Sequence, residues 1–199
     1  GSHAALVLLN AGHDVIIYDS FINSSENVIK AIKVYLQRKK VKFNLTTICG
    51  DIRNYDCLDK VFKDSIIEGM PIEAVIHFAG LKSVFESVKI PLRYWEVNVF
   101  GTKNLLEVMR INKCYSLVFS SSATVYGQPE SLPISEKDKL LPLNPYGRSK
   151  LAIEYMLEDV YKSNDKLWKI CVLRYFNPVG AHPSGFLGEN PIGIPNNLF

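Results

Sequence analysis

Five short segments of the chain are rich in β-branched or apolar residues. Near-continuous apolarity, in place of strict alternation, is typical of strands that are buried on both faces of a parallel sheet. The pattern therefore predicts five strands, at Asp14–Tyr18, Asn44–Cys49, Ala74–Phe78, Leu117–Ser121 and Ile170–Tyr175.

Amphipathic stretches between these strands are long enough for helices. A short helix is predicted at His3–Asn10, with Gly12 as its C-terminal cap. Longer helices are predicted at Tyr55–Ile67, Pro91–Ile111 and Tyr146–Tyr161. Strands and helices alternate, which predicts an α/β fold with a doubly wound parallel sheet, covered by helices on both faces.

The two ends of the chain depart from this pattern. A doubly wound fold should open with a strand and a glycine-rich turn, and neither is present. After Asn177 the sequence becomes a loop rich in proline and glycine. We therefore expect a first domain over residues 1–176, a second one that begins over 177–199, and truncation at both ends. The absent strand is central in such a sheet, so we expect the first two strands to lack hydrogen bonds to the rest and the isolated chain to be unstable.

Composition narrows the class of protein. Of 199 residues, 47% are hydrophobic and 22% are charged, which is typical of a globular protein and excludes a disordered or fibrous one. The net charge of +3 comes from 23 basic residues interspersed with 20 acidic ones, so no nucleic-acid partner is indicated. The longest apolar runs are too short for a membrane span. The four cysteines form no Cys-x-x-Cys pair and the four histidines are scattered, which predicts no metal site and a cytoplasmic protein with reduced thiols.

The most specific chemical pattern is formed by Ser122, Tyr146 and Lys150. A tyrosine and a lysine four residues apart on a helix point the same way, so the ammonium can lower the pKa of the phenol. The resulting phenolate is a general base for a sugar or alcohol hydroxyl. Ser122 lies at the end of a predicted strand, where it can hydrogen-bond the same hydroxyl. Spacing alone also fits an ordinary surface pair, but Pro145 before the helix and the strand-end serines favour the catalytic interpretation.

Two aspartates end predicted strands. Asp19 follows the first strand, where a carboxylate can accept hydrogen bonds from the ribose of a dinucleotide, although it can also simply cap a turn. No arginine follows it, which favours NAD over NADP. Asp51 follows the second strand and is placed to meet an adenine. His77 lies within an apolar strand and is expected to be a core histidine.

Longer motifs carry a family resemblance. Gly50-Asp51-Ile52-Arg53, the run from Val75 to Lys82, the run from Ser120 to Gly127, Pro145 to Lys150, and Leu173 to Gly185 resemble the UDP-glucose 4-epimerase family. This family lies within the extended short-chain dehydrogenase/reductase superfamily. The resemblance extends from Gly1 to Phe199, and it places Gly1-Ser2-His3 on the tail of the family's glycine-rich turn.

The resemblance implies an isomerase of galactose metabolism that interconverts UDP-galactose and UDP-glucose through transient oxidation at C4 by bound NAD. It implies a Rossmann-type domain, the start of a substrate lobe, and a homodimer formed through Pro91–Ile111 and Tyr146–Tyr161. Ser122, Tyr146 and Lys150 are implied as catalytic residues that also contact the cofactor. The other implied cofactor contacts are Asp19, Ser20, Phe21, Ile22, Asn23, Ser24, Asp51, Ile52, Phe78, Ala79, Gly80, Leu81, Lys82, Asn98 and Phe176. The implied substrate contacts are Ser122, Tyr146, Asn177 and Asn197.

Two other functions stay open on the sequence. One is a related nucleotide-sugar enzyme such as a 4,6-dehydratase, whose chemistry needs a carboxylate beside the catalytic hydroxyl. Ser122-Ala123-Thr124 offers none. The other is an inactive fragment that acts as a binding module, which the expected truncations favour and the intact Ser122, Tyr146 and Lys150 oppose.

Overall fold

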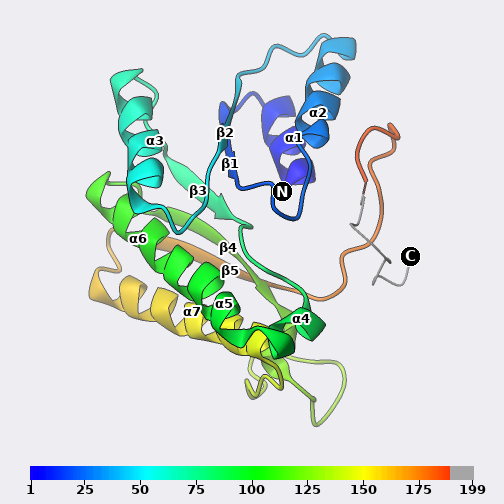
Figure 1. Cartoon of the computed structure of the whole chain (residues 1–199), viewed down its shortest axis with the longest axis vertical. Coiled ribbons are helices and arrows are strands. Elements are labelled where there is room, and N and C mark those ends of the chain that lie inside the picture. Colours follow the sequence, from blue (N-terminus) through cyan, green and yellow to red (C-terminus); the bar gives the residue numbers. More distant parts are fainter. Residues whose placement is uncertain (189–199) are drawn as a thin grey trace. The chain divides into compact units, whose positions relative to one another are not determined.

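The computed structural model describes residues 1–188 of the chain. The chain divides into two compact units, one of Gly1–Asp51 with Asn177–Phe199 and one of Ile52–Phe176. Each unit is described by itself below, and Figure 1 shows the elements of both. The described strands form two separate parallel sheets, β1-β2 in the first unit and β3-β4-β5 in the second. This is the α/β class and the separation of strands that the sequence predicts.

The first unit is built on two parallel strands. Its elements are α1 (Ser2–Asn10), β1 (Val15–Asp19), α2 (Asn27–Arg38) and β2 (Leu45–Cys49). The ladder runs in register from Val15–Leu45 to Asp19–Cys49. Leu9 of α1 and Ile32 and Leu36 of α2 are fully buried, and they form one apolar cluster with Leu187. The two helices therefore bury their apolar stripes against each other and the strands.

The end of α1 confirms the predicted glycine cap. Gly12 has a φ of 87°, in the left-handed region that glycine adopts without strain. Its N–H donates to Leu9 O at 3.1 Å, and the N–H of His13 donates to Leu8 O at 3.1 Å. This pair of hydrogen bonds satisfies carbonyls that the last turn of a helix leaves free.

The second unit holds a three-stranded parallel sheet in the order β3-β4-β5. The strands are β3 (Ala74–His77), β4 (Ser116–Ser122) and β5 (Lys169–Tyr175). The helical segments are α3 (Tyr55–Ile67), α4 (Val84–Lys89), α5 (Pro91–Tyr94), η1 (Trp95–Phe100), α6 (Gly101–Ile111), η2 (Ala123–Tyr126) and α7 (Pro145–Ser163). Helix α7 packs along β4 and β5, and α3 packs on α6 (Figure 1). Phe119 at the centre of β4 is fully buried between these layers.

Asparagine and serine side chains fix where the helices of this unit begin. The Oδ1 of Asn54 accepts from Cys57 N at 3.0 Å, Ser83 Oγ accepts from Glu86 N at 3.2 Å, and Asn144 Oδ1 accepts from Gly147 N at 2.8 Å. Each bond satisfies an amide that the first turn of a helix cannot pair internally. The caps set the start of α3, α4 and α7, and the last of these determines the position of Tyr146.

The long helix predicted over Pro91–Ile111 contains a segment of different pitch. Residues Trp95–Phe100 form a π-helical turn between α5 and α6. A π turn widens the helix by one residue and is frequent at functional sites. Asn98 is the buried residue of this turn, and its exposed fraction is 2%.

The predicted strands and helices are all present, with ends shifted by up to two residues. Sequence reasoning did not predict α2, α4 or η2. The assignment of domains to residues 1–176 and 177–199 stays a prediction. The compact units divide the chain after Asp51 and after Phe176 and group residues 177–199 with residues 1–51. Within residues 1–188, no helix combines the length and the apolarity that crossing a membrane requires.

Candidate active site

Ser122, Tyr146 and Lys150 lie on two neighbouring elements of the second unit. Ser122 is the last residue of β4 and is 9% exposed. Tyr146 lies in the first turn of α7, and Lys150 lies one turn further on and is 5% exposed. Helix α7 packs on β4 (Figure 1), so the three predicted residues lie on two elements in direct contact.

The start of α7 is held tightly beside the end of β4. Pro145 occupies the first turn and supplies the backbone angle that a helix needs. A Cβ on Gly147 would lie 2.9 Å from both the Cβ of Pro142 and the carbonyl oxygen of Thr124. Only a residue without a side chain lets the helix approach η2 this closely, and this approach brings Tyr146 beside Ser122.

The hydroxyl of Ser122 is oriented by its own turn. Its Oγ accepts from Thr124 N at 3.2 Å and from Thr124 Oγ1 at 3.0 Å. Since the oxygen accepts from this side, its own proton is available to another acceptor. A hydrogen-bonding interaction with Ser122 also acts to lower the pKa of the Tyr146 phenol.

Lys150 is a buried amine. Its Nζ donates to the carbonyl oxygen of Ser120 at 2.8 Å and lies 4.8 Å from the centre of the Phe119 ring. Burial lowers the pKa of Lys150 to about 8, and the charge of Glu154 opposes this shift. The Nζ lies 5.9 Å from the centre of the Tyr146 ring. A cation is thus held near the phenol by fixed contacts.

The pKa of Tyr146 differs from the sequence prediction. We expected the lysine to lower it, whereas burial raises the pKa of Tyr146 above its usual value. The reason is that the phenol is largely desolvated, while the Lys150 ammonium is bound to Ser120 O instead of the phenol oxygen. In this state Tyr146 is a neutral phenol.

Tyr94 packs edge-on against Tyr146, with ring centres 6.4 Å apart. Its hydroxyl lies 2.7 Å from Ser83 O and 2.8 Å from Glu86 Oε2, and its side chain is fully buried. Burial and the adjacent carboxylate of Glu86 raise the pKa of Tyr94. Tyr94 therefore stays neutral and packs against the Tyr146 ring. The sequence analysis did not single it out.

Asn98 holds the loop that follows β3. Its Oδ1 accepts from Leu81 N at 2.8 Å, and its Nδ2 donates to Leu81 O at 3.0 Å and to Ser149 Oγ at 3.1 Å. A Cβ on Gly80 would lie 2.9 Å from the Asn98 Oδ1, and Gly80 has a φ of 148°. The amide of Asn98 thus ties the predicted cofactor loop, residues 78–82, to α7. Its predicted direct contact with a cofactor stays a prediction.

His77 is a core residue, as the sequence suggests. It is 4% exposed, and its Nε2 lies 2.9 Å from the hydroxyl of Thr102, which donates to Asn98 O at 2.5 Å. Burial, with a smaller contribution from Lys150, lowers the pKa of His77 to about 3. The imidazole is therefore neutral and links β3 to the turn that carries Asn98.

Sequence reasoning missed a buried ion pair one turn beyond Lys150. Glu154 lies one turn after Lys150 on α7, and its Oε2 accepts from Arg174 Nη2 at 2.7 Å. The hydroxyl of Ser121 donates to the same carboxylate. A glutamate at the fourth position after the lysine, on the buried side of α7, was the available signal.

The other predicted contacts are distributed over both units. In the second unit, Ile52 is buried against Gly101, whereas Phe78 and Phe176 are 38% and 60% exposed. In the first unit, Asp19 Oδ1 accepts from Phe21 N at 2.8 Å and from Ser24 Oγ at 3.3 Å. Asp19 therefore caps its own turn, the alternative considered from the sequence. The predicted Asn197 lies outside the described residues.

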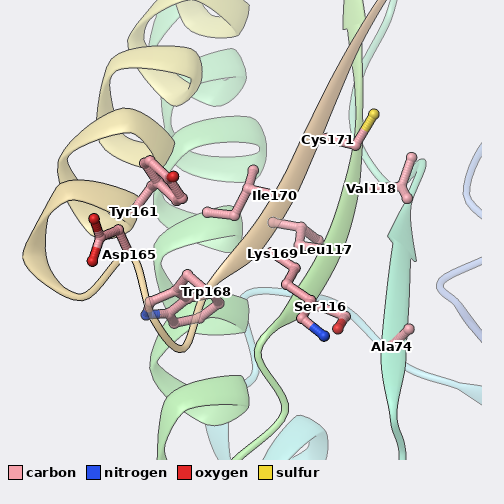
Figure 2. A pocket seen from close by; sticks show the side chains of 10 residues that line it. All are labelled: Ala74, Ser116, Leu117, Val118, Tyr161, Asp165, Trp168, Lys169, Ile170 and Cys171. Atoms are coloured by element: carbon pink, nitrogen blue, oxygen red, sulfur yellow. The ribbon is translucent and has the colours of Figure 1, made fainter.

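We assign no chemical role to the hollow at the starts of the strands or to the cysteines. Figure 2 shows a hollow of about 640 Å³ lined by the starts of β3, β4 and β5 and by residues near the end of α7. Since Ala74 pairs with Ser116 and Ser116 with Lys169, this hollow lies at the opposite end of the strands from Ser122. Residues 1–188 contain no group of histidine, cysteine and acidic side chains that could hold a metal ion, and all four cysteines are free.

The fold and site define a Rossmann-type α/β domain with a serine–tyrosine–lysine site. A family model described as GDP-mannose 4,6 dehydratase matches residues 1–192, and the chain belongs to this family.

Several proteins to which the chain is similar are named UDP-glucose 4-epimerase. The chain is 50% identical, over its whole length, to 54% of UDP-glucose 4-epimerase 1 of Oryza sativa subsp. japonica. It is also similar to the UDP-glucose 4-epimerase of Stenotrophomonas maltophila, solved with NAD and formylated UDP-arabinopyranose. That likeness has 41% identity and a TM-score of 0.90 and covers 100% of this chain and 56% of that one. The enzyme of Bifidobacterium longum, in complex with NAD⁺ and UDP, gives 43% identity and a TM-score of 0.89 over 99% and 56% of the two chains. The chain thus spans about half the length of the relatives it matches.

Proposed function

We propose that this chain is the cofactor-binding part of a UDP-glucose 4-epimerase, which interconverts UDP-galactose and UDP-glucose by transient oxidation at C4 of the sugar. The observation that carries the proposal is the placement of Ser122 at the end of β4 with Tyr146 and Lys150 on the helix that packs against it. The likeness to epimerases at about 50% identity supports the same reaction.

The proposed cofactor is NAD, and the residues present fit it. Ala79 and Gly80 are small and follow β3, where a nucleotide must approach the backbone closely. Asp19 ends β1 and is not followed by an arginine, which favours an unphosphorylated ribose. The turn of residues 19–24, Asp51, Ile52, the loop of residues 78–82, Asn98 and Phe176 are the proposed contacts. When bound, NAD supplies a reversible acceptor for the hydride of C4.

Tyr146 is the proposed base for the 4-hydroxyl proton. Burial raises its pKa, so the phenolate forms only when a positive charge stabilises it. The Lys150 ammonium is the candidate, because it lies 5.9 Å from the ring centre. Ser122 hydrogen-bonds the same sugar hydroxyl and helps to transfer the proton. The proton then returns from Tyr146 after the 4-keto sugar has presented its other face.

The substrate lobe is proposed to begin at Asn177. Asn177 and Asn197 are proposed contacts of the UDP-sugar, together with Ser122 and Tyr146. The reaction assigns the protein to galactose metabolism, and the four free cysteines favour the reducing environment of the cytoplasm.

A homodimer is proposed through the helices over residues 91–111 and 146–161. Large apolar side chains in and beside these helices are exposed, among them Phe85 at 73%, Leu92 at 81% and Tyr155 at 54%. Large apolar side chains that are exposed in this number on neighbouring helices support an interaction surface there. Sedimentation of the protein produced from its complete gene, with Leu92→Asp as the disrupting variant, tests this assembly.

A 4,6-dehydratase is the nearest alternative, because the family model carries that description. Its chemistry needs a free carboxylate beside the catalytic hydroxyl, and Ser122-Ala123-Thr124 provides none. The buried carboxylate of α7, Glu154, is bound to Arg174 and Ser121. A binding module without turnover is the other alternative.

The test is a coupled assay for the conversion of UDP-galactose to UDP-glucose, on protein produced from the complete gene. Turnover that is lost in Tyr146→Phe supports the proposal. Bound NAD without turnover of either UDP-sugar contradicts it and favours the binding module. Release of a 4-keto-6-deoxy sugar instead favours the dehydratase.

A further inference from the structure

The buried carboxylate of Glu154 is fixed from three elements. Arg174 of β5 binds this carboxylate in a bidentate manner. Its Nη2 donates to Oε2 at 2.7 Å, and its Nε donates to both carboxylate oxygens at 3.2 Å. Ser121 of β4 donates to Oε1. Paired donors of this kind restrict both the position and the orientation of a carboxylate.

Arg174 is itself held on its other side. Its Nη1 donates to the hydroxyl of Tyr126 at 2.8 Å, and its guanidinium lies 5.0 Å from the centre of the Tyr126 ring. Tyr126 is the last residue of η2, the turn that begins directly after Ser122. The ion pair therefore connects α7 and β5 to the turn that orients the catalytic serine.

Consecutive serines of β4 contact successive turns of α7. Ser122 interacts with Tyr146, the carbonyl of Ser120 accepts from Lys150, and the hydroxyl of Ser121 donates to Glu154. Side chains four residues apart lie on one helix face. The contact of Glu154 with Ser121 therefore fixes the position of Tyr146 and Lys150 along β4.

We propose that Glu154, held by Arg174 and Ser121, is a positioning residue that keeps the Lys150 amine protonated and in register with Tyr146. The inference rests on the proposed function. In that function, the protonated amine of Lys150 stabilises the Tyr146 phenolate. Glu154 has no contact with substrate in this role and acts through Lys150.

Among residues 1–188, the titratable groups near Lys150 are the neutral phenol of Tyr146 and the carboxylate of Glu154 on α7, and the neutral imidazole of His77 on β3. Arg174 of β5 is paired with Glu154, and β4 contributes the Phe119 ring and the Ser120 carbonyl. The carboxylate of Glu86 is hydrogen-bonded to the hydroxyl of Tyr94. Glu154 is therefore the anion that offsets the burial of the amine, and its removal would also leave the Arg174 cation without its partner.

The test measures the protonation of Lys150 directly. Full-length protein is labelled competitively with acetic anhydride between pH 6 and 10, and acetylation of Lys150 is quantified by mass spectrometry. We expect Glu154→Gln to move the midpoint of amine protonation down by about one pH unit or more from its value of about 8. The basic limb of the pH profile of turnover should move with it, and Glu154→Asp should restore part of both shifts. Glu158→Gln, one turn further and exposed, is the matched control.

A double variant covers the case in which Glu154→Gln does not fold. Glu154→Gln combined with Arg174→Met leaves no unpaired charge, and the amine midpoint should again lie below that of the unsubstituted protein. A folded variant, single or double, with an unchanged Lys150 titration overturns the inference. Absence of epimerisation in the unsubstituted protein overturns the proposed function instead, and the labelling still measures Lys150.

Discussion

Asn98 binds both backbone groups of a single residue, Leu81. The side-chain oxygen accepts from Leu81 N at 2.8 Å and the side-chain nitrogen donates to Leu81 O at 3.0 Å. Leu81 lies in the loop after β3, where backbone amides would otherwise be buried without partners. The π-helical turn directs Asn98 to this position, and one side chain thereby defines the conformation of the loop beside α7.

Asn98→Ala should destabilise the second unit strongly. It leaves the N–H and C=O of Leu81 buried without partners, at about 1–3 kcal/mol for each group. Asn104→Ala is the matched control, because Asn104 is also buried and donates to Arg53 O at 3.0 Å. Urea denaturation should give a loss for Asn98→Ala at least twice that for Asn104→Ala. Equal losses would show that the two bonds to Leu81 add nothing.

Gly147→Ala should separate Tyr146 from Ser122. A Cβ at this position lies 2.9 Å from Thr124 O and from the Pro142 Cβ, so the first turn of α7 must move away. A shift of about 1 Å at a catalytic group can cost about 10²-fold in rate. We expect a loss of this order in turnover with KM changed little. In Gly69→Ala the added Cβ contacts nothing within 4 Å and only backbone strain arises, so turnover should be retained.

Lys150→Met should stabilise the protein at neutral pH while it removes activity. The pKa of Lys150 falls to about 8 in the folded state from 10.5, so the unfolded state binds more protons between these values. Stability therefore rises as the pH rises from 8 to 10.5, and below pH 8 the burial of the charge costs about 3 kcal/mol. Urea denaturation at pH 7.5 and pH 10 should show a smaller pH dependence in Lys150→Met. A variant that is less stable at pH 7.5 and equally pH-dependent would contradict this.

His77→Gln should reduce sensitivity to acid. The pKa of His77 falls to about 3 in the folded state, so only the unfolded state takes up this proton as the pH drops below 6.5. Stability due to this group is complete above pH 6.5 and decreases toward pH 3, by about 2 kcal/mol at pH 5. Glutamine can retain a hydrogen bond to Thr102 and does not titrate. Denaturation at pH 7 and pH 5, with His13→Gln as the exposed control, should show the smaller loss in His77→Gln only.

The sequence predicts the strands and helix α7 well because burial and capping leave local signals. β4 carries three consecutive apolar residues, Leu117, Val118 and Phe119, and Asn144-Pro145 specifies the start of α7. The π-helical turn was not predictable, because Pro91–Ile111 has a continuous helical pattern and the distortion depends on the contact of Asn98 with Leu81. Helix α2 was missed although its sequence carries a helical signal: Ile29, Ile32 and Leu36 recur at helical spacing, and they are the residues that the helix buries.

The sequence predicts which residues make up the site better than it predicts their pKa values and hydrogen bonds. Spacing shows that Tyr146 and Lys150 share a helix face, but it does not show what else binds the amine. Ser120 O takes the hydrogen bond of Lys150, and burial raises the pKa of Tyr146. Glu154 and Arg174 meet across 20 positions of sequence, a tertiary pairing that local patterns do not contain.

The central claim is that Tyr146 removes the 4-hydroxyl proton while the hydrogen on C4 leaves and returns to the same carbon. UDP-galactose labelled with deuterium at C4 tests it most directly, with full-length protein in ordinary water and the product analysed by mass spectrometry and NMR. We predict UDP-glucose that retains the deuterium at C4, and no product from Tyr146→Phe above about 10⁻² to 10⁻⁴ of the unsubstituted rate. Product that carries solvent hydrogen at C4, or full turnover in Tyr146→Phe, would contradict the account.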